Sequence, residues 1–397
     1  MKKTTYSNVI LGIVLLLFIF ASCTKKYNGP LFPVKNLENK WGYIDTLGNE
    51  LIKFQYDSAC SFSEGYAIVK KDQNLSYINQ LGEKQFDVKL GKNSPFLIRL
   101  IPKKVFLEDY NFYNGLALFY DETVGLYGYK NMKNHIVIKP GFVEAKRFSE
   151  DLAAVNIIID SSKNEFSSIY KHKFGYINTK GEIVIQPQYD EAYSFEEGKS
   201  FVNFDSNDTF GKDGLMSIGW TGYYINNKGK FVSESLGFVN GSSFRNGFAI
   251  IQSINNKLMG YNSYYYVDSL FDHCPIINDK EFYFNEANRF SEGVATVCNG
   301  SKWFLINKKF ELVIQNEFER IFRCSEGLLR INDQGKYGFI NKAGALVIKC
   351  KFVNCSDFKN GLAYAELEDF NVFTWGYINR KGVFIWQLTK QKQNSNH

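Results

Sequence analysis

The sequence predicts an all-β protein built from tandem repeats of short antiparallel strands. Aromatic residues make up 17% of the 397 positions, with 36 Phe and 25 Tyr, and such side chains favour pleated strands. The chain also has 32 Gly but only 7 Pro, a balance that suits many tight turns. A short stretch recurs along the chain, and no window shows the periodicity of a capped helix.

The recurring stretch has the pattern of a β-hairpin. Two short apolar segments flank a polar turn that contains Gly. The copies read "WGYIDTLGNEL" from Trp41, "FGYINTKGEI" from Phe174, "YGFINKAGAL" from Tyr337 and "WGYINRKGVF" from Trp375. A longer template, Trp41 to Val69, adds a Phe-Ser-Glu-Gly turn and a third strand.

The spacing inside the template is constant in five copies. The first Gly of the template precedes the Gly of the Phe-Ser-Glu-Gly turn by 23 residues. The five pairs of positions are Gly42 and Gly65, Gly128 and Asp151, Gly175 and Gly198, Phe304 and Gly327, and Gly338 and Gly361. Weaker copies between them bring the total to about eight units plus a terminal half-unit, which start roughly every 34 to 52 residues.

One unit buries too little apolar surface to be stable alone, so neighbouring units must stack. The stack closes into a propeller-like ring or runs as an open, curved β-solenoid, and both remain open here. We expect Gly42 to remove a side chain where an aromatic residue of the adjoining unit packs closely. We expect the late-unit phenylalanines to fill the space between units: Phe62, Phe148, Phe195, Phe290 and Phe358.

The N-terminus has the features of an exported protein. Lys2 and Lys3 precede the apolar stretch "VILGIVLLLFIF", Val9 to Phe20, which is too short for a membrane span and suits a signal peptide. The following "FASC" resembles the lipobox of bacterial lipoproteins, in which cleavage leaves a lipid-modified Cys, here Cys23. Phe20 stands where Leu is usual. An uncleaved anchor, or an ordinary signal peptide with a chance Cys, is the alternative.

These features predict four segments: a signal peptide over 1–22, a lipidated Cys23 and tether over 23–39, the repeat array over 40–386 and a polar tail over 387–397. The lipobox resemblance implies an outer-membrane lipoprotein that faces the periplasm or the cell surface. Thr24, rather than Asp, follows the Cys and disfavours retention in the inner membrane.

The repeats themselves resemble the WG repeat, a short bacterial β-rich repeat named for its Trp-Gly pair. Only Trp41-Gly42 and Trp375-Gly376 keep the literal pair, and Tyr or Phe replaces Trp in other units. The resemblance extends from about Lys40 to Trp386. It implies a structural repeat without catalytic residues and, by analogy, a binding or scaffolding role.

No set of residues in the sequence predicts catalysis, a cofactor or a metal. Glutamates recur in the Phe-Ser-Glu-Gly turns, where we expect them to accept hydrogen bonds from backbone N–H groups. They are Glu64, Glu150, Glu197, Glu292 and Glu326. The four histidines, His135, His172, His273 and His397, lack the spacing of metal ligands.

The remaining cysteines show no disulfide framework, although an exported protein could pair some of them. They are Cys60, Cys274, Cys298, Cys324, Cys350 and Cys355. Cys355 occupies a small-residue position and reads as a buried thiol, while Cys350 and Cys355 are one conceivable pair. The net charge of +6 is too dispersed to indicate nucleic-acid binding.

One row of aromatic residues occupies the Trp position of the repeat, and it either packs between units or forms a platform for sugars or apolar peptides. The row consists of Trp41, Tyr127, Phe174, Trp303, Tyr337 and Trp375. Three inserts break the repeat, 89–110, 156–173 and 203–219, and read as surface loops that could carry specificity.

We therefore expect a non-enzymatic, lipid-anchored module that binds protein or glycan partners at the cell envelope, with binding residues unknown. A hydrolase of envelope polymers, using loop carboxylates as acid and base, is the alternative from another class. A purely structural spacer is a third.

Overall fold

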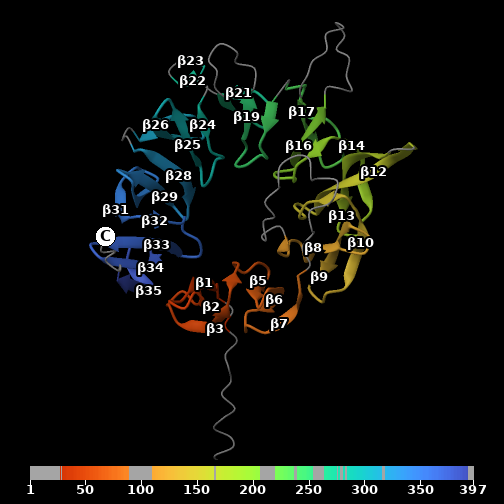
Figure 1. Cartoon of the computed structure of the whole chain (residues 1–397). Coiled ribbons are helices and arrows are strands. Elements are labelled where there is room, and N and C mark those ends of the chain that lie inside the picture. The colour runs from red at the N-terminus through yellow and green to blue at the C-terminus, as the bar shows by residue number, and fades with distance from the viewer. Residues whose placement is uncertain are drawn as a thin grey trace, which may run out of the picture.

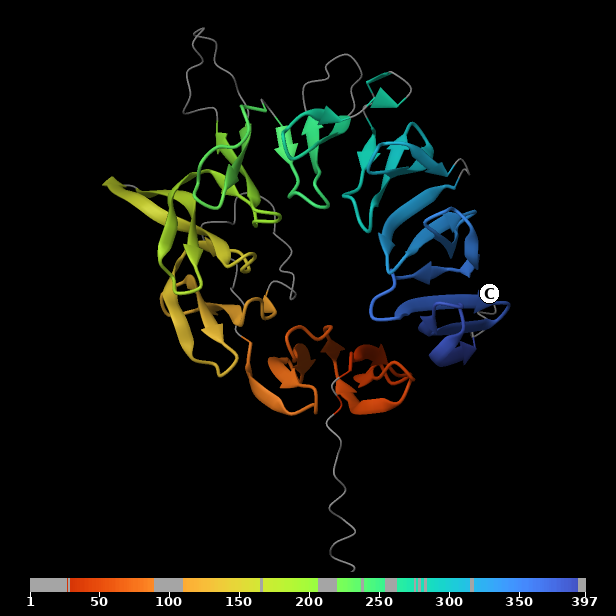
Figure 2. The same ribbon diagram turned by 180° about the vertical axis from the view of Figure 1, so that it is seen from behind.

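The computed structural model is an all-β ring of small antiparallel sheets (Figure 1), which confirms the predicted fold class. Figure 2 shows the same ring from behind. The structure describes residue 27 and residues 29–88, 110–164, 167–205, 220–236, 239–253, 263–274, 276–277, 280–281, 284–314 and 318–391. Within these ranges nine sheets form the blades of a propeller, so the ring is the correct alternative and the open solenoid is not.

Five blades come from the first part of the chain. Blade 1 contains β1 (Phe32–Lys35), β2 (Trp41–Ile44) and β3 (Glu50–Tyr56). Blade 2 contains β4 (Ser58–Ala59), β5 (Tyr66–Lys71), β6 (Asn74–Asn79) and β7 (Lys84–Asp87). Blade 3 contains β8 (Leu116–Asp121), β9 (Leu126–Asn131) and β10 (Ile136–Phe142). Blade 4 contains β11 (Glu144–Ala145), β12 (Leu152–Asn164), β13 (Ser167–Asn178) and β14 (Ile183–Tyr189). Blade 5 contains β15 (Glu191–Ala192), β16 (Lys199–Asp205) and β17 (Trp220–Asn226).

Four further blades complete the ring. Blade 6 contains β18 (Val239–Gly241), β19 (Ala249–Ser253), β20 (Ser263–Val267) and β21 (His273–Cys274). A separate hairpin follows, β22 (Ile276–Ile277) and β23 (Lys280–Glu281). Blade 7 contains β24 (Glu286–Ala287), β25 (Val294–Asn299), β26 (Lys302–Asn307) and β27 (Leu312–Ile314). Blade 8 contains β28 (Arg320–Ser325), β29 (Leu328–Asp333), β30 (Lys336–Asn341) and β31 (Leu346–Phe352). Blade 9 contains β32 (Asn354–Cys355), β33 (Leu362–Asp369), β34 (Val372–Asn379) and β35 (Phe384–Gln391).

The sequence repeat is out of phase with the blades. The strands of each blade pair in chain order, and Figure 1 shows β1, β5 and β8 nearer the centre of the ring than β3, β7 and β10. The template over residues 41–69 therefore supplies the outer hairpin β2–β3 of blade 1 and the inner strands β4 and β5 of blade 2. Each repeat thus connects two neighbouring blades covalently.

The same turn closes the outer hairpin of all nine described blades. An Asp or Asn side chain at the end of the strand accepts hydrogen bonds from the backbone N–H groups two and four residues later, as an Asx turn does. These residues are Asp45, Asn79, Asn131, Asn178, Asn226, Asp268, Asn307, Asn341 and Asn379. The Asp or Asn of this turn therefore marks every described blade, whereas the Gly three residues later is replaced by Asn134, Phe271 and Phe310 in blades 3, 6 and 7, each with a positive φ.

The Gly of the Trp-Gly pair permits a close approach of the partner strand in its own hairpin. In blade 4, Phe174 pairs with Tyr189 while Tyr176 pairs with Ile185, so the outer strand bulges toward Gly175. A Cβ at Gly175 would lie 2.6 Å from the Ile185 carbonyl oxygen. At Gly42 a Cβ would likewise lie 2.5 Å from the Ile52 carbonyl oxygen. The expectation that an aromatic residue of the adjoining unit requires Gly42 is therefore wrong, because the close neighbour is the backbone of the partner strand.

The core lies largely between adjacent blades. The Tyr of the Trp-Gly-Tyr motif is buried and packs its ring against a Phe of the next blade, at 4.8 Å between centroids for Tyr129 and Phe148 and also for Tyr176 and Phe195. The Tyr129 hydroxyl also donates a hydrogen bond of 2.7 Å to the Lys146 carbonyl of that blade. Four of the predicted plugs, Phe148, Phe195, Phe290 and Phe358, are at most 2% exposed, and Phe62 is partly buried. The prediction of phenylalanine plugs is confirmed.

The ring closes by packing between blades 9 and 1, and we call this interface the closing seam. The terminal half-unit, β34 and β35, pairs with β33 and so completes blade 9, not blade 1. Across the seam the rings of Phe32 and Tyr377 lie 5.3 Å apart, and Leu362 belongs to the same apolar cluster as Phe32. The blades extend from Phe32 to Gln391, beyond both expected ends of the array.

The insert at 156–173 was expected to be a surface loop, and that expectation is wrong. β12 and β13 continue as one antiparallel hairpin from Leu152 paired with Asn178 to Asn164 paired with Ser167, with one irregularity between Ile158 and Asp160. The backbone groups of the insert that face the opposite strand are therefore paired in the ladder. The other two inserts fall mostly outside the described residues.

Candidate functional site

The recurring glutamates link neighbouring blades and are not gathered in one site. Each Glu adopts a positive φ, between 47° and 53°, in its turn. The Glu197 carboxylate accepts hydrogen bonds from the N–H groups of Asn246 and Gly247, at 2.5 and 2.8 Å, in the equivalent turn of the next blade. Glu64, Glu150, Glu292 and Glu326 make the same kind of bond, to Gly115, Gly198, Gly327 and Gly361. The expected backbone role of these carboxylates is confirmed, and their distribution around the ring provides no paired acid and base.

The histidines and cysteines form no common centre among the described residues. No group of three or more His, Cys, Asp and Glu side chains there is close enough to hold a metal ion. The Nδ1 atom of His172 lies 3.0 Å from the Asn156 Oδ1 atom, so this ring nitrogen has a hydrogen-bond partner.

No disulfide joins the five cysteines whose side chains are described, Cys60, Cys298, Cys324, Cys350 and Cys355. Cys355 is 2% exposed, as expected for a buried thiol. Burial raises the pKa of the Cys324 and Cys355 thiols to about 12, so both are protonated near neutral pH.

Cys23, the predicted lipidation site, lies outside the described residues, as do His397 and the signal peptide. The structure has no helix in its described part that could cross a bilayer.

The row of aromatic residues at the Trp position does not form one exposed platform. Phe174 and Trp303 are buried, at 5% and 6% exposure, and Tyr127 and Tyr337 pack against the cores between blades. Trp41 and Trp375, however, belong to blades 1 and 9 and are half-buried beside the closing seam. The two residues that keep the literal Trp-Gly pair are therefore brought together.

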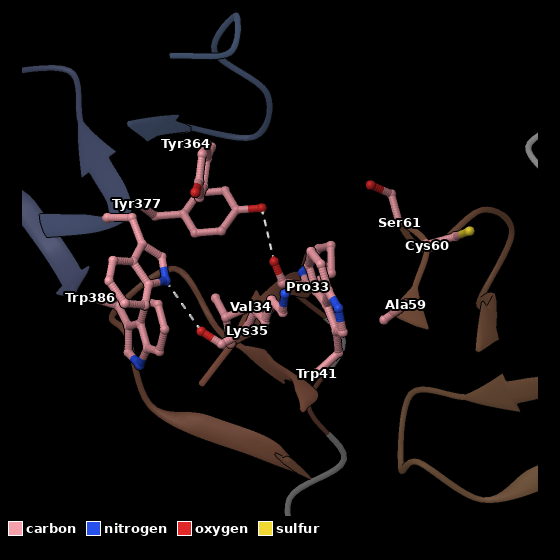
Figure 3. A pocket seen from close by; sticks show the side chains of 11 residues that line it. Pro33, Val34, Lys35, Trp41, Ala59, Cys60, Ser61, Tyr364, Tyr377 and Trp386 are labelled. Atoms are coloured by element: carbon pink, nitrogen blue, oxygen red, sulfur yellow. Dashed lines mark hydrogen bonds between the residues drawn. The ribbon is translucent and has the colours of Figure 1, made fainter. Parts of the chain in front are cut away.

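A cavity of about 500 Å³ opens at the closing seam. Five aromatic residues line it: Trp41, Tyr364, Trp375, Tyr377 and Trp386. The other lining residues are Pro33, Val34 and Lys35 of β1, together with Ala59, Cys60 and Ser61 of blade 2. Figure 3 shows Tyr364 and Tyr377 on the blade 9 side, with Cys60 and Ser61 opposite.

The cavity lies where blade 2 has its inner strand, β4. In blade 2 the inner segment donates two backbone hydrogen bonds to β5, from Asp57 N to Lys70 O and from Cys60 N to Ile68 O. By register, Pro33 and Lys35 of β1 correspond to Ile68 and Lys70, since Val34 pairs with Gly42 as Val69 pairs with Ser76. Among the described residues, the sheet of blade 1 begins with β1 and has no strand inside it.

Side chains from blade 9 replace the missing hydrogen-bond donors. The Tyr377 hydroxyl donates to the Pro33 carbonyl at 3.1 Å, and the Trp375 indole N–H donates to the Lys35 carbonyl at 3.4 Å. Both bonds are drawn in Figure 3. They satisfy the two β1 carbonyls that correspond to the acceptors in blade 2, and they hold Trp375 and Tyr377 at the cavity wall.

The cavity carries one charged side chain, Lys35, and neutral phenols. Burial raises the pKa of Tyr377 to about 12 and, together with the hydrogen bond to Glu366, raises the pKa of Tyr364 beyond that. Both phenols are therefore protonated at physiological pH. Lys35 is the one charged residue among those that line the cavity, and no described residue forms an ion pair with it.

Sequence reasoning placed Trp41 and Trp375 in a possible binding row but missed the cavity itself. Pro33, Lys35, Tyr364 and Trp386 were assigned to the tether, the repeats or the end of the array. One signal was available: "FPVK" aligns with the third strand of the template but lacks the Phe-Ser-Glu-Gly turn before it.

Comparison with family models identifies WG repeats along this chain. The model of the WG containing repeat matches residues 41–74, 127–157, 174–207, 281–303, 303–337 and 337–369. The predicted resemblance is confirmed at the level of the repeat. No curated protein matches the sequence.

Comparison with solved structures supports the propeller fold. A crystal structure of a eukaryotic initiation factor is similar over 92% of this chain and 97% of that chain, with a TM-score of 0.56 and 9% identity. AztD from Citrobacter koseri aligns over 89% of this chain and 95% of its own, with 11% identity and a TM-score of 0.36. At 9% identity, the similarity to the initiation factor shows a common fold and nothing about function.

Proposed function

Because the chain carries WG repeats arranged as a nine-bladed propeller, we propose that it is an exported, lipid-anchored module that binds a protein or glycan partner at the cell envelope without catalysing a reaction. Cys23 is its lipidated residue, on the periplasmic side of the outer membrane or at the cell surface. No cofactor, metal or nucleic acid takes part.

The observation that carries this proposal is the contrast between the repeat positions and the seam cavity. The recurring Glu, Tyr and Phe side chains are engaged in blade-to-blade contacts, as Glu197, Tyr176 and Phe195 illustrate. The seam cavity departs from the repeat and presents aromatic faces with one cation, Lys35. Hydrolysis of an envelope polymer would need paired carboxylates, and the cavity wall has none. Its lining favours binding.

Replacing Cys23 by alanine is expected to abolish lipid processing and to move the protein from the membrane fraction to the soluble fraction. Each buried CH₂ of an acyl chain contributes about 0.8 kcal/mol of membrane affinity. The measurement is membrane fractionation with metabolic labelling by a fatty acid. Cys60→Ala is the matched control and should stay with the membrane. Unchanged fractionation and labelling of Cys23→Ala would contradict the proposed anchor.

Deleting residues 161–168 is expected to preserve folding and to weaken capture of an envelope partner. The deletion removes the outer end of the β12–β13 hairpin, while the pairs from Leu152 with Asn178 to Ile158 with His172 remain. Thermal unfolding and affinity capture from solubilised envelopes test both expectations. A variant that unfolds, or one that captures partners as well as the parent, would exclude this hairpin as the recognition element.

A further inference from the structure

Two separate features of the chain form the seam cavity, one in blade 1 and one in blade 9. In the part of the chain that the structure describes, blade 1 has no strand inside β1, which leaves space beside Pro33 and Lys35. Blade 9 then turns Trp375 and Tyr377 toward that space and anchors both to β1. The side chains at the wall are therefore held in place before any ligand arrives, which reduces the entropy lost on binding.

The aromatic residues at the wall provide flat apolar faces with polar edges. Three indoles and two phenols line the cavity, whereas its aliphatic side chains are limited to Pro33, Val34 and Ala59. Such rings suit a ligand that also has an apolar face and a polar edge. A pyranose ring has this character, because its C–H groups lie on its faces and its hydroxyls project around its rim. The volume of about 500 Å³ is typical of sites for small ligands.

The charge of the cavity selects among sugars. Lys35 is its one charged lining residue and has no ion-pair partner among the described residues. Trp375 and Tyr377 already donate to β1, and Tyr364 donates to Glu366, so Lys35 is the one lining residue with a cationic donor that no described residue engages. It favours an anionic acceptor, and it disfavours a quaternary ammonium that would otherwise suit an aromatic cage.

We propose that the seam cavity binds an acidic saccharide unit of the uronic acid type, one or two sugar residues in extent. The sugar stacks on the indole faces of Trp41 and Trp386, and its carboxylate pairs with the Lys35 ammonium. This inference rests on the proposed binding function and names the ligand class for one site. An aromatic or apolar peptide segment is the competing occupant, and the experiment separates the two.

The experiment titrates the full-length protein in detergent with three probes, by calorimetry and by tryptophan fluorescence. The probes are a disaccharide of glucuronic acid and glucose, its neutral analogue built from two glucose units, and a short tryptophan-containing peptide. We expect the acidic disaccharide to bind more tightly than the neutral one by about tenfold, because one charge-assisted hydrogen bond is lost with the carboxylate. The peptide should not compete.

Two variants have matched controls within the same chain. Lys35→Met should lower the affinity for the acidic sugar by about tenfold and leave the affinity for the neutral sugar unchanged. Lys70→Met, at the same register position in blade 2, should change neither affinity. Trp41→Phe should weaken both sugars, and it should fold because Phe174 occupies the equivalent position in blade 4. Trp303→Phe, the equivalent change away from the seam, should bind both sugars normally.

Failure of both sugars to bind would overturn the inference, and so would equal losses in Lys35→Met and Lys70→Met. Binding of the peptide in place of the sugars would assign the cavity to a protein partner. The proposed function is tested separately, because capture of envelope partners that persists in Lys35→Met and Trp41→Phe would retain it while rejecting this site.

Discussion

Replacing Gly175 by valine is expected to leave the protein largely unfolded. A Cβ at this position would lie 2.6 Å from the Ile185 carbonyl oxygen and 2.8 Å from the Pro187 nitrogen. Both atoms belong to the backbone, so no side-chain rotation can relieve the clash, and the β13–β14 hairpin must separate. The expected loss exceeds about 4 kcal/mol, a large share of the roughly 5–15 kcal/mol by which native proteins are stable.

Urea unfolding followed by circular dichroism, together with soluble yield, measures this effect. Gly141→Val is the matched control, because Gly141 also lies in a strand, has no positive φ and would place its Cβ no closer than 3.9 Å to the Lys139 carbonyl oxygen. If Gly175→Val unfolded at the same urea concentration as the parent, the close approach of the two strands would not determine the need for glycine here.

The repeat pattern predicted the fold because the residues that recur are the ones that build each blade. Asn178 closes its turn through its own side chain, and Phe195 fills the space between two blades. Both roles can therefore be predicted from the spacing of these residues in the repeat. The repeat pattern does not predict whether the units close into a ring or form an open solenoid. Closure of the ring depends on contacts such as Tyr377 with Pro33, which are 344 residues apart in sequence.

The reason for the Trp-Gly glycine was also beyond the sequence, because a missing side chain does not reveal which neighbour requires the space. Blade 2 has Ser76 in place of Gly, and its hairpin pairs Ser76 with Asp87 and Tyr77 with Phe86 without a bulge between them. Blade 4 has Gly175 and a bulge, whereas blade 9 has Gly376 paired in register with Gln387. The partner-strand backbone is too close for a Cβ in both blades, so this close approach, and not the bulge, requires the Gly.

The seam cavity could be predicted only in part, because it depends on both ends of the array. The described sheet of blade 1 has no strand inside β1, and blade 9 supplies the side chains of the wall. Trp41 and Trp375 were visible as equivalent positions, but their proximity follows from closure of the ring. Lys35 lies in a segment expected to be a tether, and its register with Lys70 emerges only from strand pairing.

The ring is expected to lose its stability steeply above about pH 10. Six phenols at the Tyr position of the repeat are at most 1% exposed, and burial raises the pKa of each above its ordinary value of 10.0. They are Tyr43, Tyr77, Tyr129, Tyr176, Tyr224 and Tyr266. Because the folded pKa lies above the unfolded one, these groups contribute their full stability below pH 10. That stability falls as the unfolded chain releases protons that the folded chain retains.

The expected slope is about 1.4 kcal/mol per pH unit for each phenol, or about 8 kcal/mol per unit for all six. Urea midpoints should therefore stay nearly constant from about pH 8 to about pH 9.5 and fall sharply by about pH 11. Tyrosinate absorbance should rise together with unfolding and not before it. Constant urea midpoints up to about pH 11 would contradict this expectation.

Tyr129→Phe provides the control for this alkaline transition. Phe339 occupies the same position in blade 8 and packs 4.8 Å from Phe358, so the ring accepts a phenyl group there. The variant loses the hydrogen bond to the Lys146 carbonyl and is expected to be less stable near pH 8 by about 1 kcal/mol. Above about pH 10, the free energy of unfolding of the variant should nevertheless fall less steeply with pH than that of the parent. The difference in slope should equal the contribution of one phenol, because Phe cannot couple unfolding to proton release. An unchanged slope in Tyr129→Phe would mean that other groups, and not the buried phenols between blades, cause the alkaline unfolding.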